Sequence, residues 1–66
     1  MQLHTQLVQA AYAFTHRNEM ELSLEAEEVV KVLAEYDLDM NPDWWLVENF
    51  KGQTGYVPAN YLRPIT

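Results

Sequence analysis

Residues 55–61 read Gly55-Tyr56-Val57-Pro58-Ala59-Asn60-Tyr61, so that two tyrosines and a proline stand in one short stretch. Another aromatic pair, Trp44-Trp45, begins eleven positions before it. A chain of 66 residues has a small interior, and bulky rings beside turn-forming Gly, Pro and Asn tend to stay partly exposed. Exposed aromatic rings at fixed positions indicate a binding groove for a ligand with flat surfaces.

The composition limits the class of protein. A chain of 66 residues forms one domain and buries only about 60% of the surface that its unfolded form would expose. The sequence has no cysteine, and hence no disulfide, thiolate ligand or thiol nucleophile, which is typical of a reducing cytoplasmic compartment. Its two histidines stand twelve positions apart without a ligand pattern around them. We therefore expect no metal and no cofactor.

The charge limits the partners. Ten acidic residues against four basic ones give a formal charge of -6, which repels phosphate backbones and anionic lipid headgroups. No apolar run approaches the roughly 20 residues of a membrane helix, and the first residues lack the features of a signal peptide. We expect neither nucleic acid nor membrane as a partner, and a cytoplasmic location. An enzyme, and with it a set of catalytic residues, is not expected, because no nucleophile paired with a base and no glycine-rich phosphate loop is present.

Short segments of strand length are predicted along the chain. Turn signals at residues 41–43, 51–53 and 58–60 divide its second half, and apolar residues alternate with polar ones before them. This pattern predicts a small all-β domain over residues 7–65, with residues 1–6 as a flexible N-terminal tail. The predicted core consists of Val8, Ala10, Leu22, Leu24, Val30, Val32, Val47, Val57 and Leu62.

One stretch favours a different structure. Residues 19–38 are rich in good helix formers, and some of their apolar residues fall near helical spacing, so propensity alone predicts an amphipathic helix. A helix here would leave only three short strands to cover it. Because tertiary context often overrides propensity, we favour strands.

Three segments resemble the signature segments of the Src homology 3 (SH3) family. They are Ala10-Ala11-Tyr12-Ala13-Phe14, Asp43-Trp44-Trp45 and the stretch at residues 55–61, in the family's order and at nearly its separations. Residues 19–24 are similar to the segment of that family in which a loop with carboxylates leads into a buried strand. The resemblance implies a five-stranded SH3-like barrel of two packed antiparallel sheets, with a short 3-10 turn near the C-terminus.

The resemblance also implies a ligand. SH3 domains bind proline-rich peptides (PxxP) as polyproline II helices, whose three-residue repeat and ridged rings suit flat aromatic walls. The resemblance implies two grooves for such a peptide, two side chains that hydrogen-bond to it, and two carboxylates beside it. The predicted peptide-binding residues are Tyr12, Phe14, Glu19, Glu21, Trp44, Tyr56, Pro58, Asn60 and Tyr61. Tyr12 and Tyr61 would line one groove, whereas Phe14, Trp44, Pro58 and Tyr61 would line the other. Tyr56 and Asn60 would donate hydrogen bonds to peptide carbonyls.

The resemblance also implies a context. We expect a monomeric module of a larger adaptor, signalling or cytoskeletal protein.

A third pocket is implied for a basic residue that flanks the prolines. Glu19 and Glu21 stand in one of its two loops, and Glu21 is the expected main contact. The other loop carries Glu35, Asp37, Asp39 and Asp43, which are as consistent with a solvated acidic loop as with recognition.

Several positions call for separate expectations. Neighbours along a strand face opposite sides, so Trp45 is expected on the outer face of the barrel while Trp44 faces the ligand. His16 and Arg17 are expected as solvated loop residues, with contact to the flank of a ligand as the alternative for either one. The chain departs from the family pattern at Ala13, where aspartate is usual, at Glu27, where a turn glycine is common, and in a longer loop over residues 35–42.

A different function stays open. A small β-barrel that reads methylated lysine through an aromatic cage would also explain tyrosines and tryptophan beside acidic residues, through cation–π attraction. It explains residues 58–61 less naturally than a proline groove does.

Overall fold

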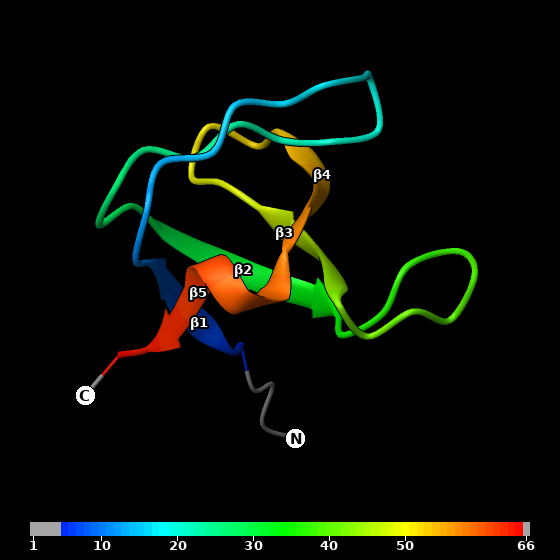
Figure 1. Cartoon of the computed structure of the whole chain (residues 1–66). Helices are drawn as coiled ribbons and strands as arrows, with labels where there is room; N and C mark the ends of the chain where they lie inside the picture. The colour runs from blue at the N-terminus through cyan, green and yellow to red at the C-terminus, as the bar shows by residue number, and fades with distance from the viewer. Residues whose placement is uncertain (1–4, 66) are drawn as a thin grey trace.

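The structure, a computed structural model, describes residues 5–65 (Figure 1). Five strands and one 3-10 turn follow one another as β1 (Leu7–Ala10), β2 (Val29–Ala34), β3 (Trp44–Glu48), β4 (Thr54–Pro58), η1 (Ala59–Tyr61) and β5 (Leu62–Pro64). The prediction of an all-β domain with a 3-10 turn near the C-terminus is confirmed. Residues 1–4 of the predicted tail lie outside the described residues. Pairing begins before β1, since the Gln6 carbonyl accepts a hydrogen bond from the Val32 N–H at 2.9 Å.

The five strands form one antiparallel sheet in the order β4-β3-β2-β1-β5. Its two edge strands, β4 and β5, follow each other in the chain with only η1 between them. Three residues bridge only a short distance, so the sheet has to curl until its edges approach each other (Figure 1). This closure of one curled sheet is consistent with the predicted five-stranded barrel of two packed antiparallel sheets.

The interior of the curled sheet holds the predicted core. Val30 in β2, Val47 in β3 and Val57 in β4 are fully buried. The remaining predicted residues either join them in the buried cluster (Val8, Ala10, Leu22 and Leu24) or pack against it while half-buried (Val32 and Leu62). Alternation of apolar residues therefore predicted the core correctly.

Residues 11–28 form a long excursion between β1 and β2, which we call the long loop (Figure 1, at the top). Its two arms are joined by an antiparallel bridge between Phe14 and Leu24, with N–H to O distances of 2.9 and 2.8 Å. A parallel bridge ties it to β4, where the Leu22 N–H donates to the Tyr56 carbonyl at 3.1 Å. Leu22 and Leu24 are thus buried through isolated bridges rather than in a regular strand.

The helix that propensity favours over residues 19–38 does not form, because these residues make the second half of the long loop, β2 and the start of the next loop. Within residues 5–65, no helix is long and apolar enough to cross a membrane. Residues 35–43, which we call the acidic loop, join β2 to β3 and project away from the sheet (Figure 1).

Candidate functional site

Four aromatic rings lie in a row on one face of the domain. The Tyr12 and Tyr61 ring centroids are 5.6 Å apart, those of Tyr61 and Phe14 are 5.9 Å apart, and those of Phe14 and Trp44 are 6.1 Å apart. All three contacts are edge-to-face, a favourable geometry for aromatic pairs. We call these four rings the aromatic row.

Separate parts of the fold bring the aromatic row together. Tyr12 and Phe14 stand at the start of the long loop, where the Ala11 N–H donates to the Tyr61 carbonyl at 2.7 Å. That hydrogen bond holds the loop against the end of η1. Trp44 is the first residue of β3 and pairs with Pro58, which directly precedes η1. The rings therefore rest on hydrogen-bonded backbone, although they come from distant positions in the sequence.

The residues of the two predicted grooves lie along the aromatic row. Tyr12 is 60% exposed and leans edge-on against Tyr61 at one end. At the other end, a pocket of about 340 Å³ is lined by Trp44, Pro58, Asn60 and Asp43. The structure thus brings six of the predicted site residues to one face. Their role in binding stays a prediction.

A larger pocket, of about 680 Å³, opens between the long loop and the acidic loop. Among its lining residues are the predicted Glu19, Glu21 and Tyr56, together with Trp44. Trp44 therefore belongs to both this pocket and the aromatic row. We call this space the interloop pocket; its full lining is Arg17, Asn18, Glu19, Met20, Glu21, Asp37, Leu38, Asp39, Trp44 and Tyr56.

The acidic loop contributes to the interloop pocket only in part. Asp37 and Asp39 line it, whereas Asp43 lines the smaller pocket beside Pro58. Asp37 also shapes its own loop, because one of its carboxylate oxygens accepts hydrogen bonds from the backbone N–H groups of Asp39 and Asn41, both at 2.9 Å. The loop contains Met40 with a positive φ of 63°, an unusual conformation for this residue type.

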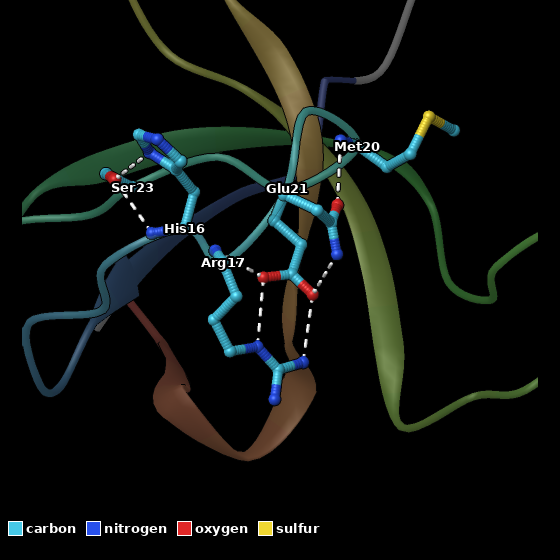
Figure 2. A network of polar contacts seen from close by, with 6 residues as sticks. His16, Arg17, Met20, Glu21 and Ser23 are labelled. Atoms are coloured by element: carbon cyan, nitrogen blue, oxygen red, sulfur yellow. Dashed lines mark hydrogen bonds and ion pairs between the residues drawn. The ribbon is translucent and has the colours of Figure 1, made fainter.

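Glu21, the expected main contact for a basic ligand residue, already has a basic partner. The Arg17 guanidinium forms a bidentate ion pair with it, with Nε to Oε1 at 3.1 Å and Nη2 to Oε2 at 2.9 Å (Figure 2). The Arg17 backbone N–H and the Asn18 side-chain amide also donate to this carboxylate, at 2.9 and 3.3 Å. These donors lower the pKa of Glu21, with the Arg17 side chain as the largest cause.

The same guanidinium lies over an aromatic ring. Arg17 Cζ is 5.0 Å from the centroid of Trp44, within the range of a cation–π contact. Arg17, expected as a solvated loop residue, is therefore a structural part of the interloop pocket. Its separation of four residues from Glu21 would have suggested a pair only on a helix, and the long loop is not helical. His16 also has a partner, since its Nδ1 lies 2.6 Å from Ser23 Oγ across the loop (Figure 2).

Trp45 differs from its expected position. It packs against the buried cluster while half-buried, and its indole Nε1 donates to the Pro42 carbonyl at 3.0 Å. The expectation of an outer-face position was wrong, because side chains of β3 alternate so that Trp45 shares the core side with Val47. Trp44 takes the opposite side, as predicted.

Comparisons with known proteins agree with this architecture. The family model described as variant SH3 domain matches residues 10–63. The chain is 48% identical over 61 residues to Rho guanine nucleotide exchange factor 38 of Mus musculus. The aligned residues cover 92% of the chain and 8% of that protein. It is 46% identical over 54 residues to dynamin-binding protein of Homo sapiens, covering 82% of the chain and 3% of that protein. The chain thus spans less than a tenth of these relatives.

Solved structures show the same fold. The C-terminal SH3 domain of myosin IB from Entamoeba histolytica, in a complex with a peptide, superposes with a TM-score of 0.82 at 31% identity, covering 98% of this chain and all of that one (100%). A structure of CED-2 gives a TM-score of 0.78 at 36% identity, covering 88% of this chain and 32% of that one. With its sequence signatures, its curled five-stranded sheet and its aromatic row, the chain belongs to the SH3 domain family.

Proposed function

We propose that this SH3 domain is a non-catalytic interaction module that binds proline-rich peptides along the aromatic row. The observation that carries the proposal is the row itself, in which Tyr12, Tyr61, Phe14 and Trp44 make successive edge-to-face contacts beside Pro58. The complex of the related myosin IB domain with a peptide supports a peptide as the class of ligand.

The physical reason lies in the shape and stiffness of both partners. A polyproline II helix has no internal hydrogen bonds and presents a ridge every three residues, so the gaps between standing rings can each receive one Xaa-Pro unit. The rings support one another edge to face and are backed by hydrogen-bonded backbone, so little conformational entropy is lost on either side. Because such an interface is small, we expect an affinity of about micromolar.

Specific side chains would fix the peptide in place. The Trp44 indole N–H is a donor only, and Asn60 beside it has an amide that can donate to a peptide carbonyl. Tyr56, at the edge of the interloop pocket, can offer its hydroxyl. These groups would set the position of a peptide whose own backbone donors and acceptors are otherwise free.

A basic residue next to the prolines is the second part of the proposal. Glu19, Glu21, Asp37 and Asp39 place carboxylates around the interloop pocket, at the end of the row where Trp44 stands. An arriving Lys or Arg would be attracted there. Surface charge pairs contribute only about 0.2 to 1 kcal/mol each, so the main effects would be on peptide orientation, on-rate and salt dependence.

The wider context is also a proposal. The relatives carry the matched segment as a small part of long proteins, an exchange factor and a dynamin-binding protein among them. We infer a reversible module within a larger signalling or adaptor protein in the cytoplasm. Reversible contacts of micromolar strength suit the assembly of such complexes.

The methyl-lysine alternative finds less support. An aromatic cage needs several rings that face one point, whereas the rings here form a row in edge-on contact. The face of Trp44 is also partly covered by Arg17.

The experiment compares two exposed aromatic residues. Tyr12 is 60% exposed within the row, and Phe50 is 65% exposed in the turn between β3 and β4, with its ring beside Lys31. By calorimetry with a PxxP peptide, Tyr12→Ala should weaken binding about tenfold, and Phe50→Ala should leave it within about twofold of the wild type. Equal losses in both variants, or binding of a methyl-lysine peptide without prolines in place of the PxxP peptide, would refute the proposal.

A further inference from the structure

The interloop pocket contains an arginine of the domain itself. The Glu21 carboxylate receives four donors, three from Arg17 and one from Asn18, spread over both oxygens. A carboxylate offers about four lone-pair sites, so these contacts use its capacity. The Glu21 side chain is only 8% exposed, whereas that of Arg17 is 64% exposed.

Arg17 also stands where the pocket meets the aromatic row. Its guanidinium is bonded to Glu21 on one edge and lies 5.0 Å from the Trp44 centroid (Figure 2 for the Glu21 contacts). Bidentate pairing with a carboxylate and stacking on an indole are the two interactions by which an arginine side chain is recognised best. Both are already formed within the domain.

We infer that Arg17 occupies the place of a ligand's basic residue and so reduces the preference of this domain for basic-flanked peptides. The inference rests on the proposed function, since it concerns the specificity of that same site. An arginine of the ligand would have to displace Arg17 from Glu21 and Trp44, or else pair with Glu19 or Asp39 at the pocket wall.

The tether explains why displacement is unfavourable. Arg17 is held four residues from its partner in the same loop, so its effective concentration at Glu21 is about millimolar or higher. The basic residue of a docked peptide is tethered as well, but it must overcome an ion pair whose two hydrogen bonds are already formed. Removal of the internal competitor should therefore increase selectivity rather than abolish it.

The long loop should keep its shape without the Arg17 side chain. The Arg17 backbone N–H still donates to Glu21, and Asn18 still bonds both Glu21 and, through its Oδ1, the Met20 N–H at 2.9 Å. The bridge between Glu21 and Tyr56 is made by backbone hydrogen bonds, from the Leu22 N–H to the Tyr56 carbonyl and from the Tyr56 N–H to the Met20 carbonyl, and uses no atom of the Arg17 side chain. Arg17→Gln and Arg17→Ala are thus suitable variants, and their fold can be checked by circular dichroism.

The test compares two peptides with one PxxP core, one flanked by Arg and the other by Ala at the same position. For the wild type and each variant, calorimetry gives the ratio of the two dissociation constants. We expect this ratio to favour the Arg peptide about two- to fivefold more strongly in Arg17→Gln and in Arg17→Ala than in the wild type. Adding Glu21→Gln to Arg17→Gln should remove the gain. Because both peptides share the PxxP core, any change in affinity for that core when Trp44 is uncovered cancels in the ratio of the two dissociation constants.

Arg63→Ala is the matched control, because it removes the same charge from β5, where Arg63 Nε contacts Gln9 Oε1 at 3.3 Å. It should leave the ratio at the wild-type value. The inference is overturned if the ratio does not rise in the Arg17 variants while both peptides bind, or if it rises equally in Arg63→Ala. If neither peptide binds the folded wild type or the folded Arg17 variants, the proposed function itself has failed, which is a distinguishable result.

Discussion

Trp44 and Trp45 are neighbours in β3, yet their indole rings lie on opposite sides of the strand and in different surroundings. Trp44 contacts Phe14 in the aromatic row and carries Arg17 over its ring. Trp45 packs against the buried cluster, and its indole N–H is bonded to the Pro42 carbonyl. One position should therefore matter for binding and the other for stability.

Alanine substitutions should separate these two roles. Trp44→Ala should weaken peptide binding about tenfold or more and change the free energy of unfolding by no more than about 1 kcal/mol. Trp45→Ala leaves a void beside the core and should lower that free energy by about 2 to 3 kcal/mol. Urea denaturation and calorimetry measure both quantities. Comparable loss of stability in the two variants would contradict the division.

The two glycines of the chain should respond differently to alanine. A Cβ on Gly55 would lie 2.7 Å from the Leu22 backbone nitrogen, where β4 meets the long loop, so Gly55→Ala should cost about 2 kcal/mol or more. Gly52 has open space around it but a φ of +82°, so Gly52→Ala should cost only about 1 kcal/mol. Chemical denaturation checks the order. A larger loss at Gly52 would show that the close approach at Gly55 relaxes freely.

Glu27 should be improved by glycine. It has a φ of 72°, a left-handed conformation that strains residues with a Cβ, and its hydrogen bonds to Ala10 and Gln9 use only its backbone. Glu27→Gly should raise the free energy of unfolding by about 0.5 to 1 kcal/mol. Glu25→Gly is the matched control, because it removes the same charge at a residue without positive φ and should destabilise. A loss of stability in Glu27→Gly would contradict the assignment of strain.

The ion pair predicts how stability depends on pH. Arg17 lowers the pKa of Glu21 below its ordinary value of 4.5, so the folded form binds a proton there less readily than the unfolded form does. The stabilisation is present above pH 4.5 and is lost as the pH falls through the lower pKa of the folded form. Melting temperatures of the wild type and Glu21→Gln should differ at neutral pH and converge in acid. A constant difference would contradict the pairing.

The core could be predicted from local alternation in the sequence, and the aromatic row from the resemblance of the signature segments to the SH3 family. Alternation places residues such as Val30 and Val57 inside, and the signature segments place Tyr12 and Tyr61 near each other. The helical propensity of residues 19–38 was overridden by tertiary contacts. Among them are the bridge between the two arms of the long loop and the bridge from the long loop to β4.

The pairing of Arg17 with Glu21 could not be predicted in this way. It depends on how the long loop turns back on itself between residues 17 and 21, and spacing alone indicates such pairs only on helices. The position of Trp45 was missed for a different reason, because strand alternation already places Trp45 on the side of the buried Val47, and this signal was readable in the sequence. In contrast, the usual glycine at the position of Glu27 was an informative signal, because that residue adopts a positive φ.

The most direct test of peptide binding along the aromatic row is a proton–nitrogen NMR titration with a proline-rich peptide. The two indole N–H signals serve as reporters, because Trp44 lies in the row whereas Trp45 is bonded to Pro42 and packs on the core. We predict that the Trp44 indole signal and the backbone signals of Tyr12 and Tyr61 shift progressively with added peptide, while the Trp45 indole signal moves little. A folded domain in which no signal of the row moves at millimolar peptide, or in which the Trp45 indole shifts and that of Trp44 does not, would contradict the account.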